Sequence, residues 1–332
     1  MNILSLFDGC SMAYQALKAA GLPITNYYSS EIDKYSEQIS RKNFPDIIRL
    51  GDVCEVKGEA LPDIDLLIGG SPCQGFSFAG KQLNFDDPRS KLFFEFVRLL
   101  GETRPRWFLL ENVRMKKEHQ DVITSYLGVE PIMINSALVS AQNRVRLYWT
   151  NIPGIEQPED RGIVLRDILE DDATEPMLSN IYGGFGEKEP RTHTGKSVTI
   201  RTAAGGGHIP SVTLKPVSQP VDAPNLSATK EGKAYALTAS YFKAVAWNSI
   251  EKKQRTMIPC KKGNGESLSN TYNGVRYRKL TPIECERLQT LPDNYTEGVS
   301  NTQRYKMIGN GFTVAVIATI LGNIKLKTNK LF

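Results

Sequence analysis

The sequence predicts an α/β protein with a Rossmann-like, doubly wound sheet. Its first 150 or so residues alternate short apolar runs with segments rich in helix formers, and repeated strand–helix units build such sheets. One apolar run, Ile64–Ile68, ends abruptly at Gly69-Gly70. The residues that follow it should therefore emerge at the carboxyl edge of the sheet, where open α/β sheets bind their ligands.

The expected elements follow in chain order. Gly21 and Pro45 end the first two helices, and a short strand precedes Gly51-Asp52. The expected strands cover 2–7, 26–30, 64–68, 107–110, 131–135 and 145–149, and the expected helices cover 12–20, 35–43, 90–101 and 117–127. We expect these units to form one parallel sheet.

The alternation stops near residue 151. Glycine clusters, prolines and scattered basic and aromatic residues then predict a smaller, loop-rich, partly β domain. Helical order resumes after Lys279, where Thr281 is a candidate N-cap and Pro282 the first helical residue. An apolar helix, 312–321, should return to the first domain. The expected division is 1–152, 153–275 and 276–332.

Composition narrows the class of protein. Of the 332 residues, 40% are hydrophobic and 23% are charged, as in ordinary globular proteins. No run approaches the roughly 18 apolar residues of a membrane helix, and Met1 leads directly into a strand-like segment, so we expect no signal peptide and a cytosolic location. Five scattered cysteines without a CxxC pair argue against a disulfide framework or a zinc site, and no metal is expected. The net charge of +5 permits a polyanionic partner.

The turn after the first strand, Phe7-Asp8-Gly9-Cys10-Ser11, occupies the mononucleotide-binding position. It is not the GxGxxG fingerprint of pyrophosphate binding. Glu31, at the end of the second strand, is placed to accept ribose hydroxyls, and Asp52 to meet an adenine amino group. Each carboxylate alone is more often a solvated loop residue or a helix cap. Together they predict a nucleoside site without phosphate contacts, which S-adenosylmethionine would fit.

Two further groups should lie at the same edge. In Ser71-Pro72-Cys73 the proline restrains the backbone, and glycines follow, so a rigidly held thiol lies beside a flexible segment. The alternative is a small buried cysteine of no chemical use. Glu111 follows the 107–110 strand. On its own it is equally well interpreted as a helix cap or a surface acid.

Gln142, Arg144 and Arg146 alternate along the last strand and should share one of its faces. Such a strand can simply present a solvated basic edge. If the arginines point inward, they suit an anionic or carbonyl-bearing substrate.

With these pieces in order, nearly all of the chain resembles the DNA cytosine-5 methyltransferase family. The first 150 residues are similar to the group that includes the animal de novo enzymes and compact bacterial or phage members. The motifs that carry the resemblance stand as Leu6-Phe7-Asp8-Gly9, Glu31, Asp52, Gly70-Ser71-Pro72-Cys73-Gln74-Gly75-Phe76-Ser77, Glu111-Asn112-Val113, Gln142-Asn143-Arg144-Val145-Arg146, Leu280 through Gln289 to Pro292, and Ile308-Gly309-Asn310.

Two departures from the family pattern stand out. The first loop lacks the family's second and third small glycines and has Ser11 and Ala13 nearby. The last motif reads Gly309-Asn310-Gly311-Phe312, where the family more commonly has Gly-Asn-Ser-Val.

The resemblance implies roles for individual residues. Cys73 would add to cytosine C6, Glu111 would act at N3 and N4, Arg146 would hold O2, and Arg144 would support the cysteine loop. The implied cofactor is S-adenosylmethionine, with S-adenosylhomocysteine as its product. Its implied binding residues are Phe7, Asp8, Gly9, Cys10, Ser11, Glu31, Ile32, Asp52, Val53, Pro72 and Asn310. The implied DNA contacts are Gln74, Ser77, Gln142 and Arg287.

The implied substrate is double-stranded DNA, with the target base flipped out under a closing 73–91 segment and the sequence read by a target-recognition domain at 153–275. We expect the protein to be a monomer. We expect it to act in restriction-modification, with a cognate restriction endonuclease, in phage self-protection, or without such a partner. Three alternatives stay open: an RNA cytosine methyltransferase, a catalytically idle DNA-binding relative, and a nicotinamide-dependent dehydrogenase.

Overall fold

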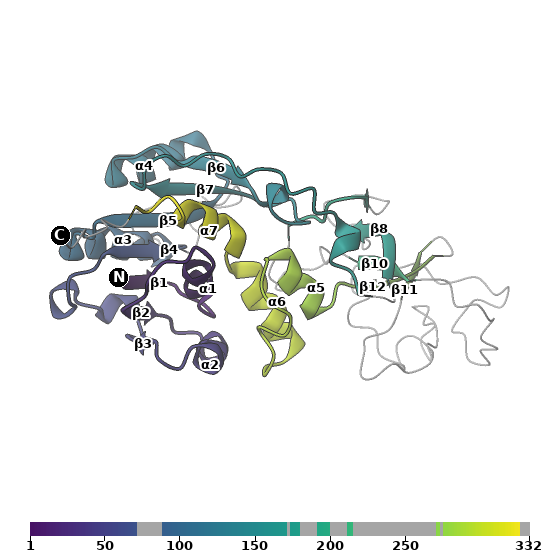
Figure 1. The fold of residues 1–332 in the computed structure, drawn as a ribbon, viewed down its shortest axis with the longest axis horizontal. Helices are drawn as coiled ribbons and strands as arrows, with labels where there is room; N and C mark the ends of the chain where they lie inside the picture. The colour runs from purple at the N-terminus through teal and green to yellow at the C-terminus, as the bar shows by residue number, and fades with distance from the viewer. Residues whose placement is uncertain are drawn as a thin grey trace, which may run out of the picture.

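The computed structural model describes residues 1–71, 88–170, 173–179, 191–199, 211–214, 270–272 and 275–325. These residues contain two sheets, which lie toward opposite ends of the molecule with α5 and α6 between them (Figure 1). The strands of the larger sheet are β1 (Asn2–Leu6), β2 (Asn26–Ser30), β3 (Ile48–Arg49), β4 (Leu66–Gly69), β5 (Trp107–Val113), β6 (Ile132–Asn135) and β7 (Val145–Thr150).

The larger sheet has the order β3-β2-β1-β4-β5-β7-β6. Neighbours from β3 to β5 are parallel, whereas β7 is antiparallel to both β5 and β6. The doubly wound α/β class is confirmed, but the expectation of an entirely parallel sheet was wrong. The connection from β6 to β7 contains only a 3₁₀ turn, Ser136–Leu138. It is too short for a helical crossover, so the chain turns back as a hairpin.

Seven helices accompany the sheets within the described residues. They are α1 (Met12–Ala19), α2 (Lys34–Asn43), α3 (Pro88–Thr103), α4 (Lys117–Leu127), α5 (Pro282–Leu288), α6 (Asn301–Asn310) and α7 (Val314–Leu321). The expected cap of α5 is present, because Thr281 and Glu284 form a reciprocal capping box with Pro282 in the first turn. None of the helices in these ranges is long and apolar enough to cross a membrane.

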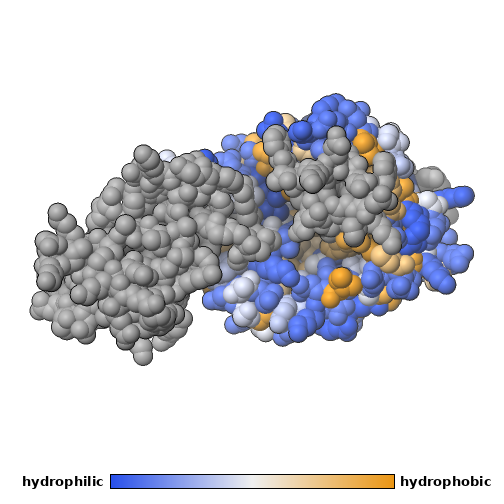
Figure 2. All heavy atoms as spheres, turned by 180° about the vertical axis from the view of Figure 1, so that it is seen from behind, coloured by the Kyte–Doolittle hydropathy of each residue, from blue (hydrophilic) through white to orange (hydrophobic). Residues whose placement is uncertain are grey.

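The core divides between the two faces of the larger sheet, following the period of two along each strand. On β4, Leu66 and Ile68 join the cluster that contains residues of α1, α2 and α7, whereas Leu67 joins the cluster that contains residues of α3 and α4. The sheet is thus covered by helices on both faces. On the coloured part of the face seen in Figure 2, hydrophilic side chains predominate, with apolar groups between them.

The C-terminal helix α7 packs on α1, with Val316, Ile317 and Ile320 in the same apolar cluster as Ala16 and Leu17. The larger sheet therefore buries one face under helices from both ends of the sequence. α6 precedes α7 and brings residues 303–310 to the carboxyl edge of the sheet.

The smaller sheet is antiparallel, with the order β11-β12-β10-β8-β9. Its strands are β8 (Ala173–Ser179), β9 (Arg191–His193), β10 (Ser211–Leu214), β11 (Asn270–Tyr272) and β12 (Val275–Lys279). β12 extends into the 276–332 segment, which the sequence assigned to the rest of the target-domain junction and to the helix that returns to the first domain. It continues because it pairs with β10 as well as with β11.

One segment of the second region returns to the first. Ser197 forms a parallel bridge with Gln142, and the backbone amides of Asn143 and Ser197 donate to Ser197 and Ala141. The Lys196 ammonium donates to the carbonyls of Ala137, Ser140 and Ile163. This pairing fixes residues 195–199 beside the chain that leads into β7.

Candidate active site

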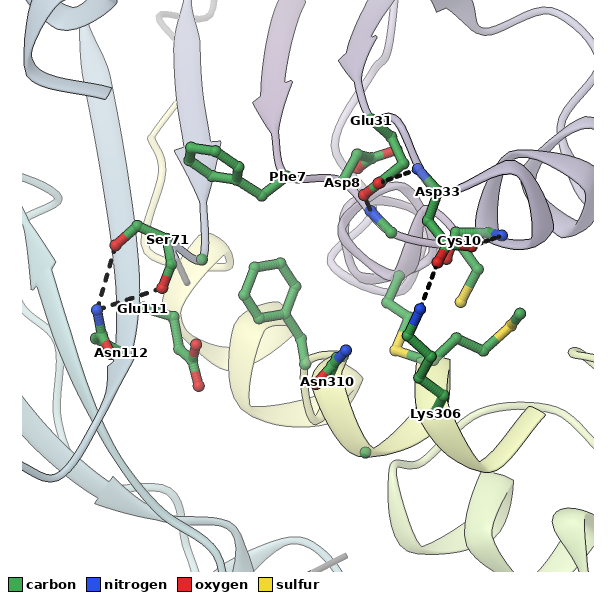
Figure 3. Close-up of a pocket in the computed structure, with 18 of the residues that line it drawn as sticks. Phe7, Asp8, Cys10, Glu31, Asp33, Ser71, Glu111, Asn112, Lys306 and Asn310 are labelled. Carbon is green, nitrogen blue, oxygen red and sulfur yellow. Dashed lines mark hydrogen bonds and ion pairs between the residues drawn. The ribbon is translucent and has the colours of Figure 1, made fainter. Parts of the chain in front are cut away.

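A pocket of about 940 Å³ opens at the carboxyl edge of the larger sheet. Its walls are the loop after β1, the turn after β2, the residues after β4, the end of β5, residues 144–146, and α6 with the loop that follows it. In Figure 3, Glu31 and Asp33 lie on one side, Ser71 and Glu111 lie on the other, and Asn310 lies between them on α6. The sequence placed the site at this edge, and the pocket lies there.

Three residues of the loop after β1 have backbone dihedral angles in the left-handed region, which gives the loop its shape. Phe7, Gly9 and Ser11 all have positive φ, at 56°, 59° and 63°. This conformation is costly for residues with a side chain and persists only where the surroundings impose it. β1 consequently ends at Leu6 rather than at Phe7, and the chain turns sharply into α1.

Asp8 supplies that constraint. It is buried, and its carboxylate accepts hydrogen bonds from the hydroxyls of Ser5 (2.5 Å), Tyr27 (2.6 Å), Ser11 (2.6 Å) and Ser29 (2.9 Å). Burial raises the pKa of Asp8 despite these four donors. Asp8 and Ser11 therefore hold the loop from inside. Asp8 borders the pocket, whereas fully buried Ser11 is not among the residues that line it.

Glu31 is held by backbone amides. One carboxylate oxygen accepts from Gly9 (2.8 Å), and the other accepts from Ile32 (2.8 Å) and Asp33 (2.7 Å). A carboxylate offers about four lone-pair sites, so roughly one acceptor site is left toward the pocket. That is compatible with accepting a hydroxyl, as the sequence suggested.

Several other candidate cofactor residues also line the pocket. The carboxylate of Asp52 accepts from the Cys54 amide (2.9 Å), and Asp52 itself is exposed. Ile32 is 75% exposed at the rim, an unusual environment for a large apolar side chain. The remaining ones that line the cavity are Phe7, Gly9, Cys10, Val53 and Asn310.

Two buried cysteines are unsuited to nucleophilic chemistry. Burial, together with the Asp8 carboxylate, raises the pKa of Cys10, and burial raises that of Cys285 as well. Both remain protonated thiols. Cys73 lies outside the described residues, as do Pro72, Gln74 and Ser77, so these four stay predictions.

The opposite wall carries an ion pair. Arg146 Nε lies 3.0 Å from Glu111 Oε1, and each side chain is only 13% exposed. Glu111 lies inside β5, not after it as the sequence suggested, because pairing with β7 prolongs β5 to Val113. A largely desolvated carboxylate and guanidinium thus face one cavity, ready to pair with polar atoms of a substrate.

Arg144 has a different environment. It is 2% exposed, and its Nη2 donates to the carbonyls of Gly309 (3.2 Å) and Gly311 (2.9 Å). Burial and the charge of Arg146 lower the pKa of Arg144 to about 9. Through its bonds to the Gly309 and Gly311 carbonyls, Arg144 supports the end of α6 and the loop that follows. Ser71, the last described residue before the 72–87 segment, accepts hydrogen bonds from the Asn112 amide at Oγ (3.2 Å) and at its carbonyl (3.4 Å). The support of the cysteine loop by Arg144 stays a prediction.

Two of the expected DNA contacts, Gln142 and Arg287, lie within the described residues. Gln142 is fully buried, and its amide donates to the Leu288 carbonyl (3.2 Å), so it has no surface to offer to DNA. It precedes β7 and bonds inward to α5. Arg287 makes two bonds to Asp293 (2.8 and 2.6 Å) and one to the Ile168 carbonyl (3.1 Å). These contacts fix the end of α5, and a DNA role for Arg287 remains a prediction.

Sequence reasoning missed Asp33 and Lys306, which form a 2.7 Å ion pair across the pocket rim. Asp33 also caps α2 through the amides of Tyr35 and Ser36. Burial opposes ionisation of Asp33, but Lys306 and the two amides outweigh it and lower the pKa of Asp33. Lys306 was detectable, because it lies one helical turn before Asn310 and so shares its face. Nothing in the sequence indicated Thr199, which reaches the pocket from beyond β9.

The fold and the site together define a Rossmann-like methyltransferase, with a single antiparallel strand beside β5 and a ligand pocket at the carboxyl edge. Residues 1–326 match the family described as C-5 cytosine-specific DNA methylase. The chain belongs to that family and is a DNA cytosine-5 methyltransferase.

Individual relatives agree. The chain is 31% identical over 322 residues to the type II methyltransferase M1.ScrFI of Lactococcus lactis subsp. cremoris, which covers 90% of this chain and 71% of that protein. It is 26% identical to the orphan methyltransferase M.SPRI of Bacillus phage SPR, over 96% of each chain. The solved methyltransferase EhMeth of Entamoeba histolytica superposes with a TM-score of 0.64 over 97% of each chain at 15% identity, which is a likeness of fold.

Proposed function

We propose that this enzyme binds S-adenosylmethionine in the 940 Å³ pocket and methylates C5 of a cytosine flipped out of double-stranded DNA, with Cys73 as the nucleophile. One observation carries the proposal. The Glu111–Arg146 pair faces the same cavity as the β1 loop, Glu31 and Asp52. Groups suited to a nucleoside and groups suited to a polar base therefore share one pocket.

The chemistry requires covalent activation. Cytosine C5 is a poor nucleophile until a thiolate adds to C6 and breaks the conjugation of the ring. Ser71 lines the pocket and is fixed by Asn112, and Cys73 follows two residues later in the sequence. Addition places negative charge on N3 and O2. We assign a proton at N3 to Glu111 and a hydrogen bond to O2 to Arg146, because both already face the cavity. After C5 has taken the methyl group, loss of the C5 proton and elimination of the Cys73 thiolate release 5-methylcytosine and the free enzyme.

The residues of the opposite wall fit the cofactor. Glu31 keeps an acceptor site for a ribose hydroxyl, and exposed Asp52 and Ile32 border the same region. When bound, S-adenosylmethionine supplies the methyl group from its sulfonium and leaves as S-adenosylhomocysteine. Asn310, at the end of α6, would close the space between the two walls.

The remaining assignments concern the partner. A stacked cytosine cannot reach a recessed pocket, so the base must be extruded. We assign sequence recognition to residues 153–275. The relatives named type II methyltransferase and orphan phage methyltransferase support a role in restriction-modification or in phage self-protection. We further propose a monomer that acts on DNA in the cytoplasm of a bacterial or phage-infected cell.

The test is to sequence a plasmid, after bisulfite treatment or through nanopores, from cells that express the enzyme. We expect 5-methylcytosine in one short sequence context. Cys73→Ser should abolish methylation while purified protein still binds S-adenosylhomocysteine in calorimetry. Full methylation by Cys73→Ser would contradict the covalent mechanism, and methyl transfer to RNA but not to DNA would contradict the assigned substrate.

A further inference from the structure

Gly311 lies directly between Asn310 and Phe312 on the pocket wall. It is the C-cap of α6, with φ −78° and ψ 173°. This is extended backbone that any residue can adopt. The backbone therefore does not explain why a glycine stands here.

The explanation is a side chain from the first helix. A Cβ on residue 311 would lie 2.2 Å from the sulfur of Met12 and 2.6 Å from its terminal methyl, far closer than atoms in contact approach. The next neighbour, the Met307 carbonyl oxygen, would lie at 3.2 Å. The Met12 thioether thus occupies the place that a side chain at 311 would need.

The backbone at 311 is fixed by hydrogen bonds to its carbonyl and its amide. Its carbonyl accepts from Arg144 (2.9 Å) and from Gln289 (3.4 Å), and its amide donates to the Met307 carbonyl (3.0 Å). Moving residue 311 would break bonds to two buried polar side chains. The side that can yield is the flexible thioether of Met12.

The Met12 thioether can move only toward the pocket. Met12 is 1% exposed and belongs to the apolar cluster in which α1 packs on α7, so the protein interior around it is filled. Met12 also lines the pocket. A side chain at 311 would therefore drive the thioether into the pocket.

We propose that Met12 and Gly311 are a size-complementary pair that sets the shape of the cofactor pocket, with glycine at 311 keeping the Met12 thioether out of the space that the cofactor occupies. This rests on the proposed cofactor site. It also accounts for one departure from the family pattern, the glycine at position 311 of the last motif. A chain with a small residue at position 12 has room for serine at 311.

The test is a double-mutant cycle on the full chain, read by calorimetric affinity for S-adenosylhomocysteine and by the KM for S-adenosylmethionine. Gly311→Ser should weaken binding about tenfold or more, which is about 1.4 kcal/mol or more, because the displaced thioether takes up cofactor space. The thermal midpoint and kcat at saturating cofactor should change little. Met12→Ala in the same chain should restore the affinity to within about threefold of wild type. Gly101→Ser is the matched control, because a Cβ there meets nothing within 4 Å.

Two outcomes would overturn the proposal. One is wild-type affinity in Gly311→Ser. The other is a double variant that binds no better than Gly311→Ser, since serine itself would then be harmful. Failure of the cofactor assignment is distinguishable, because wild-type enzyme would then show no binding or methyl transfer at all.

Discussion

The two walls of the pocket hold their charges in different ways. On the wall built by β1 and β2, the carboxylates of Asp8 and Glu31 bind hydroxyls and backbone amides within the first 33 residues. On the wall built by β5 and β7, Glu111 pairs with Arg146 across two antiparallel strands. The first wall is held by hydroxyls and amides from β1, β2 and the turns that follow them, and the second by an ion pair between side chains of neighbouring strands.

We call the wall built by β1 and β2 the shaping wall, because its carboxylates hold the loops in place. We call the wall built by β5 and β7 the chemical wall, because its ion pair can bind substrate atoms. The Asp8 carboxylate accepts from four neighbouring hydroxyls and fixes the loop, whereas Glu31 accepts from three amides and keeps about one acceptor site for a ligand. An ion pair between side chains can exchange its partner for substrate atoms when water is excluded. The variants below test that division, from the largest expected effect to the smallest.

The largest effect should come from the chemical wall. Glu111→Gln keeps the size of the side chain but cannot carry the proton, so methyl transfer should fall by about 10²–10⁴-fold, the usual share of general acid–base catalysis. Affinity for DNA and cofactor should change far less. The control is Glu102→Gln, which removes a carboxylate bonded to Arg98 and Gly58 outside the pocket. Unchanged turnover in Glu111→Gln would exclude it as the acid.

In the shaping wall, titration of Asp8 should change the free energy of unfolding with pH. Burial raises the folded-state pKa of Asp8 above its unfolded value of about 3.9, so the native state binds the proton more tightly than the unfolded chain. Stability should therefore fall as the pH rises from the ordinary aspartate value through the raised one. Each tenfold change in the acid constant corresponds to about 1.4 kcal/mol. Asp8→Asn should remove this slope in urea titrations at a series of pH values, and an unaltered slope would assign it to another group.

The smallest effect should come from the pair that joins the shaping wall to α6. Lys306→Met should weaken cofactor binding by about two- to fivefold, the range of an exposed ion pair, and the loss should shrink in high salt. Lys117→Met is the control, because Lys117 also lies 2.7 Å from a carboxylate, that of Asp121, but outside the pocket. Equal effects of the two substitutions would show that the Asp33–Lys306 pair has no special role.

The sequence predicted the features of the shaping wall better than the contacts between distant segments. Period, turn residues and edge position located the β1 loop, Glu31 and Asp52, because each depends on neighbours in the chain. The antiparallel course of β7, the inward bond of Gln142 to Leu288 and the approach of Met12 to Gly311 depend on contacts between distant segments. Propensity and periodicity carry no information about such contacts. The resemblance implied a DNA contact for Gln142, whereas in the structure Gln142 bridges to Ser197, donates to the Leu288 carbonyl and is buried.

The position of α6 in the chain also bears on how the enzyme matures. All strands of the larger sheet are complete by Thr150, so that sheet can begin to form while the ribosome is still making the second region. The wall that carries Lys306, Asn310 and Phe312 is translated only afterwards. A nascent chain thus lacks one side of its pocket until both regions have been synthesised. Because α6 follows the second region in the chain, methyl transfer cannot begin until the segment that we assign to DNA-site recognition has been translated.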